Sequence, residues 1–213
     1  MKIILASKSP RRKEILQKHG IEPIIMPADT DETLPDGIGM TEAVEMLAER
    51  KAQACCEKIL ADPELRSRFS VCECGNSRHE TTSPETGKYL IIGSDTIVWK
   101  DEIMGKPADQ SDAFRMLDKL RGTHHYVVTG VAVIDPASGS RTVFSDITTV
   151  HFKNYTDRDI LDYISREEPY DKAGSYAIQE YFGRYIDHIE GDYENVVGFP
   201  YYRLEAIIKK HEQ

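Results

Sequence analysis

The sequence has few cysteines and no long apolar run. Its 213 residues include four cysteines, and all of them lie between Cys55 and Cys74. This clustering favours reduced thiols over a disulfide scaffold. No apolar segment is long enough to cross a membrane. The apolar run from Ile3 to Ala6 is too short for the core of a signal peptide, so we expect a cytoplasmic protein.

The chain also lacks an excess of positive charge. Its formal net charge is −9, whereas proteins that bind nucleic acids are usually basic. We therefore expect neither nucleic acid nor a membrane as a partner. An acidic protein can still bind a nucleotide through a local basic cluster. The length suits one sizeable core, and no repeat or linker divides residues 1–213, so we expect a single domain.

Several common catalytic motifs are absent. There is no Gly-x-x-x-x-Gly-Lys-Ser/Thr loop, no His-Glu-x-x-His and no Gly-x-Ser-x-Gly. The sequence therefore gives no support to a P-loop enzyme, a zinc protease of that type or an α/β-hydrolase.

The first informative segment runs from the strand expected at Ile3–Ala6 through Ser7 to a basic helix start. Ser9 fits the N-cap and Pro10 the first helical position. Arg11 and Arg12 then lie in the first turn, where the helix dipole disfavours cations. A solvated basic turn is one explanation. An anion bound by the free backbone N–H groups and the guanidinium groups is the one we favour.

Two charged features follow. Residues 29–33 form an acidic segment in a proline-containing loop, which is either a solvated turn or the edge of a metal site. From Thr41, the expected N-cap, to about Leu60 the pattern predicts a helix. Lys51 lies on the same helix face as Val44 and the other apolar residues. Its ammonium group either extends to solvent or meets a polyanion.

Residues 61–87 are rich in charge, Ser, Thr, Gly and Cys, with a possible short helix at 63–69. We expect a flexible surface insertion there. Cys72 and Cys74, with His79 nearby, could bind zinc, although their spacing matches no common zinc finger.

The segment Tyr89–Trp99 predicts a central strand that is interrupted at Gly93-Ser94. Asp95 follows. Aspartate is disfavoured in strands, and burying its charge between apolar runs is unfavourable unless the carboxylate has a specific role. It either caps a turn or points a carboxylate into a cleft that the glycine leaves open.

The remaining pattern predicts an α/β protein. We expect a hairpin at 100–103, an antiparallel strand pair at 126–134 and 141–152, and helices at 109–120, 156–165 and 201–211. His124, His125 and His151 lie at strand ends without metal-ligand spacing, and we interpret them as structural or solvated.

Five separated motifs resemble the Maf family of nucleoside triphosphate pyrophosphatases. They are Ile-Leu-Ala-Ser-Lys-Ser-Pro-Arg-Arg-Lys-Glu-Ile-Leu, Asp-Glu-Thr at 31–33, Leu-Ala-x-x-Lys-Ala around Lys51, Gly-Ser-Asp-Thr at 93–96, and Asp-Lys-Ala-Gly-Ser-Tyr-Ala-Ile-Gln at 171–179. Asn-Val-Val-Gly-Phe-Pro at 195–200 is similar to the family's closing motif. The resemblance implies a long mixed sheet flanked by helices, with two lobes around a central cleft.

The resemblance also implies an activity: cleavage between the α and β phosphates, with release of a monophosphate and pyrophosphate. It implies a divalent metal cation, Mg²⁺ or Mn²⁺. The roles it implies are Asp95 as catalytic base; Asp95 and Glu32 as metal ligands; Ser7, Arg12, Lys51 and Lys106 as phosphate-binding residues; Arg11, Thr96 and Gln179 as residues that select dTTP and UTP; and Asp171 and Lys172 as other cleft residues.

The sequence departs from the family pattern at Glu180, where glycine is usual, and at Phe199, where leucine is usual. Glu180 would add bulk and charge near the expected base pocket. Two other functions stay open: a non-catalytic nucleotide-binding regulator of cell division, and a scaffold that binds a partner through the cysteine-bearing insertion. A homodimer is possible.

Overall fold

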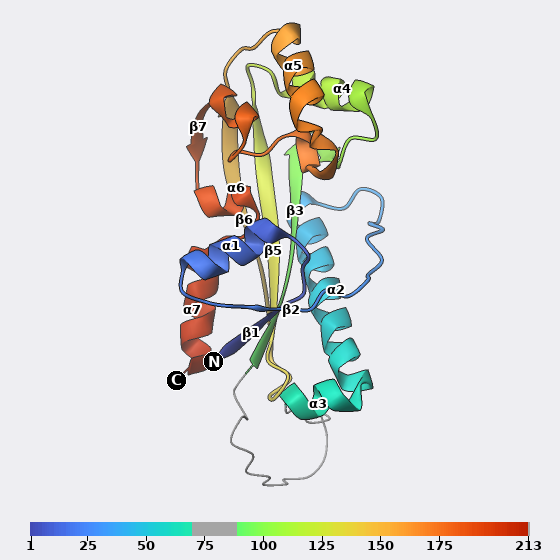
Figure 1. Ribbon diagram of the computed structural model, residues 1–213, viewed down its shortest axis with the longest axis vertical. Coiled ribbons are helices and arrows are strands. Elements are labelled where there is room, and N and C mark those ends of the chain that lie inside the picture. The colour runs from blue at the N-terminus through green and yellow to red at the C-terminus, as the bar shows by residue number, and fades with distance from the viewer. Residues whose placement is uncertain (70–88, 213) are drawn as a thin grey trace.

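A computed structural model describes residues 1–69 and 89–212. These residues form one seven-stranded mixed sheet in the order β2-β1-β3-β5-β6-β7, with β4 paired to β3 (Figure 1). The strands are β1 (Lys2–Leu5), β2 (Ile24–Ile25), β3 (Tyr89–Lys100), β4 (Glu102–Met104), β5 (His124–Ile134), β6 (Arg141–Phe152) and β7 (Ile186–Glu190). The helices are α1 (Pro10–Lys18), α2 (Met40–Ala61), α3 (Pro63–Phe69), α4 (Gln110–Leu120), α5 (Asp157–Glu167), α6 (Tyr193–Val197) and α7 (Tyr201–Glu212), with short 3₁₀ turns η1 (Pro169–Asp171), η2 (Ala173–Ser175) and η3 (Tyr181–Tyr185).

Strand alternation gives the sheet two apolar faces. Ile3 and Leu5 of β1 pack with residues of α1, α6 and α7, whereas Ile4 packs with residues of α2 and α3 on the opposite face. Both cores consist largely of Ile, Leu, Val and Ala side chains. This half of the molecule is therefore a helix–sheet–helix sandwich, as the sequence pattern predicts.

The other half has an aromatic core. Phe152, Tyr155, Tyr163 and Phe182 are each 5 % exposed or less, and they pack with the apolar faces of α4 and α5. Figure 1 shows α4 and α5 at one end of the molecule and α1, α2 and α7 toward the other, with β3, β5 and β6 running between them. The long strands thus connect two lobes, and the predicted fold is confirmed.

One edge of β3 is shared by two short strands. β1 pairs with β3 up to Leu5↔Ile92, and β4 pairs with it from Met104↔Val98 onward. Among the described strands, none pairs with residues 93–97 along this edge. The chain therefore leaves both short strands at the same break in the sheet, at Ser7 after β1 and at Lys106 after β4.

Two local predictions are corrected. The N-cap of α2 is Gly39 and not Thr41, because the helix begins at Met40. β3 is continuous: Gly93 and Ser94 pair in register with Ala132 and Val131. Glycine is needed here for helix packing, since a Cβ on Gly93 would collide with the backbone carbonyl of Ala48 in α2.

The other predicted elements are confirmed to within two residues, including the helix at 63–69 and the capping box formed by Thr156 and Asp159. Cys72, Cys74 and His79 lie outside the described residues. No described helix combines the length and the apolar composition that crossing a membrane requires.

Candidate active site

Arg12 connects three separate segments of the chain. Its Nε donates to the carbonyl oxygen of Gly198 at 2.9 Å, its Nη1 to Ser7 Oγ at 3.0 Å and its Nη2 to Thr96 Oγ1 at 3.0 Å. The Arg12 side chain is therefore fixed by hydrogen bonds and is not a freely solvated start of the helix.

The backbone around Arg12 fits this role. Ser9 is the N-cap of α1 and Pro10 its first residue, as predicted, but the Ser9 side chain makes no capping hydrogen bond. Gly198 ends α6 with a φ of 116°, in the region that favours glycine. Its carbonyl can then face Arg12. Burial lowers the pKa of the Arg12 guanidinium, whereas the negative charge of Asp95 acts in the opposite direction.

Lys51, Asp95 and Glu32 form a second arrangement, which we call the Lys51 cluster. Lys51 Nζ lies 2.5 Å from Asp95 Oδ1 and 2.7 Å from Glu32 Oε1. The side chains of Lys51 and Asp95 are 16 % and 15 % exposed. Of the two sequence-based alternatives, extension of the ammonium to solvent is wrong, because it ends between two carboxylates. The hydrogen bond from Lys51 holds the pKa of Glu32 below its usual value.

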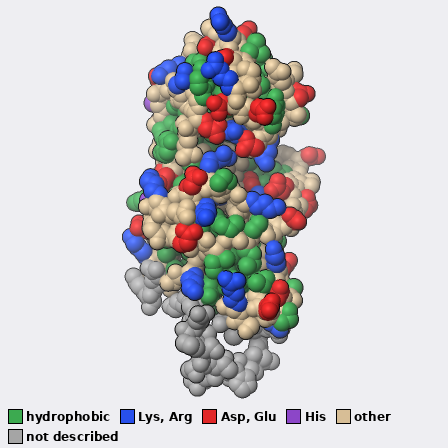
Figure 2. All heavy atoms as spheres, viewed as in Figure 1, with side chains coloured by type: hydrophobic (Ala, Val, Ile, Leu, Met, Phe, Trp, Pro, Cys, Tyr) green, Lys and Arg blue, Asp and Glu red, His purple; other side chains and the backbone are tan. Residues whose placement is uncertain are grey.

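The two arrangements meet across β3. Thr96 bonds Arg12 from α1, and Asp95, the preceding residue, bonds Lys51 from α2. Consecutive strand residues point to opposite faces, so α1 and α2 contribute from the two faces of the sheet. Residues 93–97 have a partner strand on one edge only, and both side chains are partly exposed there. Figure 2 shows Lys and Arg mixed with Asp and Glu where the two lobes meet.

The donor set of the Lys51 cluster fits a divalent cation. Asp95 and Glu32 direct carboxylate oxygens at one positive group, the Lys51 ammonium. Carboxylate oxygens are the ligands that Mg²⁺ and Mn²⁺ prefer.

The other predicted residues lie around this centre. Lys106 is exposed, and its charge helps to lower the pKa of Glu32. The charge of Arg11 likewise helps to lower the pKa of Asp171, although the hydrogen bond from Lys172 has the largest effect. Gln179 is exposed in the turn after η2. The structure thus brings Ser7, Arg12 and Thr96 into one hydrogen-bonded group and Lys51, Asp95 and Glu32 into another. Within the described residues, no hydrogen bond or ion pair joins the side chains of Arg11, Lys106 or Gln179 to either group.

Glu180, the unusual residue of this loop, has a cationic partner. Lys172 Nζ lies 3.3 Å from Glu180 Oε2 and 2.8 Å from Asp171 Oδ1. The Lys172 side chain is 9 % exposed, and these carboxylates raise its pKa against the opposing effect of burial. The negative charge of Glu180 is therefore balanced within the protein.

Sequence reasoning missed the residues that support Thr96. Thr96 Oγ1 lies 3.0 Å from Thr129 Oγ1, and Thr129 donates to the carbonyl of Asn195 at 3.1 Å. Asn195 is fully buried, and its amide donates to Thr148 Oγ1 at 3.0 Å and to the carbonyl of Val127 at 3.1 Å. Two signals were available: a threonine inside the apolar run of β5 and the closing motif that begins at Asn195.

A hollow of about 580 Å³ is lined by residues that include Lys8, Asp29 and Lys58. Asp29 belongs to the acidic segment, but none of the residues to which the family resemblance gives a role lines this hollow. We therefore place the candidate active site by its charged groups and not by this hollow.

The motifs, the fold and the geometry agree with one family. A family model described as "Maf-like protein" matches residues 2–211. The chain belongs to the Maf-like protein family. A curated dTTP/UTP pyrophosphatase from Acetivibrio thermocellus is 40 % identical over 211 residues, covering 98 % of this chain and 94 % of that protein. One from Citrifermentans bemidjiense is 43 % identical over 199 residues, covering 93 % and 89 %.

Among solved structures, a nucleoside-triphosphatase / dITP/XTP pyrophosphatase from Mycobacterium abscessus matches with 17 % identity and a TM-score of 0.36, over 71 % of this chain and 74 % of that one. At this score the likeness carries no argument. The family model over residues 2–211 is what shows the family.

Proposed function

We propose that this Maf-like protein hydrolyses dTTP and UTP to the monophosphate and pyrophosphate. The observation that carries the proposal is the convergence of Lys51, Asp95 and Glu32 beside the fixed guanidinium of Arg12. Cations that bind phosphates, next to carboxylates that bind a metal and accept a proton, are the groups that phosphoanhydride hydrolysis needs. The names of the curated relatives support the choice of nucleotides.

In this proposal the basic residues bind the triphosphate. Arg12 has three donors occupied by Gly198, Ser7 and Thr96, and its remaining N–H groups are left for a phosphate oxygen. Lys106 follows β4 at the break in the sheet and would bind a second phosphate. Lys51 would exchange a carboxylate for a phosphate oxygen when the substrate enters. Ser7 accepts a hydrogen bond from Arg12 and would contact the same phosphates.

Asp95 would accept the proton of the attacking water as the α-phosphorus is attacked. Asp95 and Glu32 would hold a divalent cation, Mg²⁺ or Mn²⁺. When bound, the cation supplies a positive charge that polarises water and balances the charge of the phosphates. Asp95 is held at a defined position because it lies in the middle of a continuous strand.

Gln179 would recognise the pyrimidine. A carboxamide offers one acceptor and two donors, which complement the edge of uracil or thymine. Arg11 and Thr96 would shape the pocket, with Thr96 acting through the position of Arg12. Glu180 would not repel the substrate, because it is paired with Lys172. Asp171, the other partner of Lys172, would stabilise the same loop.

The deciding experiment measures pyrophosphate released from UTP, dTTP, CTP, ATP, GTP and 7-methylguanosine triphosphate, each with Mg²⁺ and with Mn²⁺. We expect the highest kcat/KM for UTP and dTTP and no turnover with a chelator present. Preference for a purine would overturn the pyrimidine assignment alone. Failure to release pyrophosphate from any nucleotide would favour a non-catalytic regulator. A cytoplasmic location, a homodimer, a single domain with an insertion at about 61–87 and a role in clearing unwanted nucleotides remain predictions.

A further inference from the structure

Three histidines lie side by side on neighbouring strands, far along the sheet from the Lys51 cluster. His124 of β5 pairs with His151 of β6, and His151 pairs with His188 of β7. Residues that pair directly across strands project from the same face of a sheet, so the three rings form a row. We call it the histidine row. The ring centroids of His124 and His151 lie 5.5 Å apart, and those of His151 and His188 lie 4.0 Å apart.

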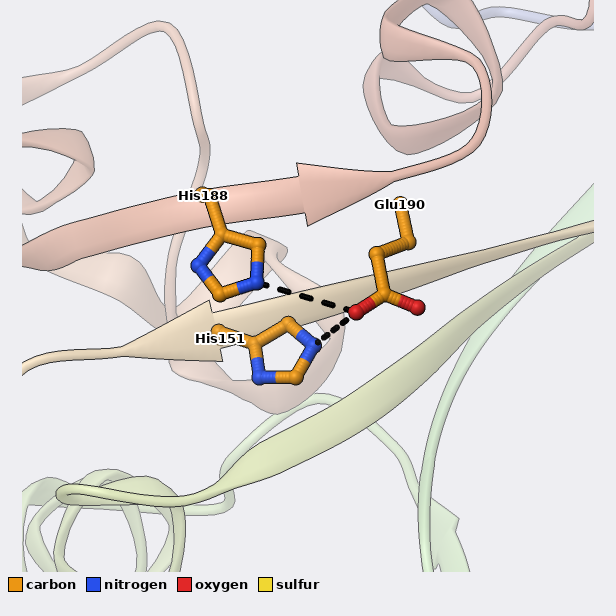
Figure 3. A group of neighbouring side chains, drawn as sticks. All are labelled: His151, His188 and Glu190. Carbon is orange, nitrogen blue, oxygen red and sulfur yellow. Dashed lines mark hydrogen bonds and ion pairs between the residues drawn. The ribbon is translucent and has the colours of Figure 1, made fainter.

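Glu190 adds a carboxylate to this row. It lies two residues after His188 on β7, so its side chain points to the same face. His151 Nε2 lies 3.1 Å and His188 Nε2 3.7 Å from the same oxygen, Glu190 Oε1. Figure 3 shows both imidazoles directed at this carboxylate. The three ligand atoms lie within 4.8 Å of one another, the one such group of His, Cys, Asp or Glu in the described part of the chain.

The second nitrogen of His188 also has a suitable partner. His188 Nδ1 lies 2.9 Å from Asp187 Oδ2. A proton held on Nδ1 by a carboxylate leaves the Nε2 lone pair free to bind a metal. This is the usual arrangement behind a metal-binding histidine, where the carboxylate fixes the tautomer and the ring orientation.

We propose that His151, His188 and Glu190 form a binding site for a first-row transition-metal dication of the Zn²⁺ class, with His124 available as a fourth ligand. Two imidazoles and one carboxylate suit Zn²⁺, Ni²⁺, Co²⁺ or Cu²⁺ better than Mg²⁺. Tetrahedral Zn²⁺ ligands lie about 3.4 Å apart, so modest side-chain rotations would close the site. The side chains are 28 %, 52 % and 65 % exposed, and the ion can enter from solvent.

The bound ion would attach an edge strand to its neighbour. β7 leads through Gly191 into α6, and α6 ends at Gly198, whose carbonyl accepts the hydrogen bond from Arg12. Joining β7 to β6 would therefore stabilise the segment that holds Arg12. This role is independent of the metal proposed at Asp95 and Glu32, which are oxygen ligands on other elements.

The test measures Zn²⁺ affinity in untagged, chelator-treated protein by competition with a chromophoric chelator, with Mg²⁺ in excess. Cys72→Ser/Cys74→Ser is the parent protein, so that these two cysteines do not contribute. We expect one Zn²⁺ per chain, affinity at least about 100-fold weaker in His151→Ala and in His188→Ala, and about 10–100-fold weaker in Asp187→Asn. His211→Ala is the matched control and should bind as the parent does.

Two further readouts separate the site from misfolding and from the candidate active site. Zn²⁺ at about 100 times its Kd should raise the Tm of the parent by about 5–10 °C and leave that of His188→Ala unchanged. Asp95→Asn should keep the parent's Zn²⁺ affinity. The proposal is overturned if His151→Ala and His188→Ala, folded as judged by their metal-free Tm, bind Zn²⁺ within threefold of the parent.

Discussion

The Lys51 cluster and the histidine row lie on the same sheet but are assembled in different ways. Lys51, Asp95 and Glu32 come from a helix, a central strand and a loop, and Lys51 Nζ lies within 2.7 Å of both carboxylates. The row comes from three neighbouring strands and is largely exposed. In the Lys51 cluster an ammonium group is paired with two carboxylates, so a phosphate or a metal ion can bind only by displacing one of these partners. In the histidine row the imidazoles and the Glu190 carboxylate have no cationic partner of this kind among themselves, so one metal ion could bind them together. Charge composition therefore predicts different chemistry for the two places.

The largest expected effect is at Asp95. Asp95→Asn keeps the side-chain shape but removes the proton acceptor, so kcat for UTP should fall by about 10²–10⁴-fold. Nucleotide affinity should change little. Asp101→Asn, the same change at an exposed turn residue of the β3–β4 hairpin, is the control. Steady-state kinetics measures kcat and equilibrium binding measures nucleotide affinity for the two variants. Near-normal turnover in Asp95→Asn would show that another group accepts the proton.

Arg12 comes next. Arg12→Ala removes a charge-assisted phosphate contact, which should cost about 1.5–3 kcal/mol of transition-state stabilisation, measured from kcat/KM. Lys13→Ala, at the following residue, changes an exposed ion pair with Glu22 and should leave kcat/KM nearly unchanged. Equal losses in the two variants would mean that general positive charge, and not the position of the Arg12 guanidinium, binds the substrate.

Gln179 tests base selection. Gln179→Ala should reduce the preference for UTP over GTP by about 1–3 kcal/mol, because a site built on hydrogen bonds rejects a mismatched base through its own unpaired groups. Glu180→Gly, which restores the residue usual in the family, should change this preference less because Glu180 is held by Lys172. A uniform slowing of all nucleotides in Gln179→Ala would count against base recognition by this residue.

His125 sharpens the contrast with the histidine row, because it is the sequence neighbour of His124 but lies buried against Tyr176. Burial lowers the pKa of His125 to about 3. Between pH 6.5 and 3 the unfolded chain binds a proton that the native protein does not, so stability is lost as pH falls. We expect a loss of about 2 kcal/mol from pH 7 to pH 5, measured by urea unfolding.

The control for this pH dependence is a pair of neighbouring substitutions. His125→Phe should remove most of the loss between pH 7 and pH 5, although the variant is less stable at every pH because Tyr176 loses its partner. His124→Gln, at the exposed neighbour, should keep the slope of the wild type. An unchanged slope in His125→Phe would assign the pH dependence to other groups.

The smallest expected effect concerns the stability of the Lys51 cluster. Lys51→Met leaves two carboxylates without their shared cation and should lower the free energy of unfolding by about 1 kcal/mol. The double variant Lys51→Met/Asp95→Asn should recover part of this loss. Chemical denaturation of the wild type, the two single variants and the double variant gives the coupling energy between Lys51 and Asp95. If the two changes are additive, the ion pair contributes little to folding.

Much of the fold was predictable from local patterns. The strand–Ser–Pro start of α1, the capping box of α5, the apolar run of β5 and the alternation in β6 each involve residues close in the chain. The site residues were recognised through motifs, and the structure then grouped six of them. The partner of Lys51 was not predictable, because its contact with Asp95 spans 44 positions and depends on how α2 lies on the sheet.

The histidine row shows a second limit of sequence reasoning. His124, His151 and His188 have no metal-ligand spacing along the chain, and their proximity results from strand register alone. Likewise, Gly93 suggested an interrupted strand, whereas its missing side chain makes room for α2. The pairing of distant strands and the placement of α2 on the sheet are tertiary properties, and the residues that they bring together have no characteristic spacing along the chain.

The close contact between α2 and the sheet has a consequence for how this protein can change. A Cβ on Gly93 would meet the backbone of Ala48 and Ala52, and one on Gly130 would meet that of Val44 and Glu45. Either addition would lift α2, and Lys51 lies on the turn between Ala48 and Ala52. Substituting either glycine by alanine would thus move the Lys51 ammonium group, although the added methyl group does not contact the substrate. In a mutational screen for activity, these two glycines should score like residues of the active site.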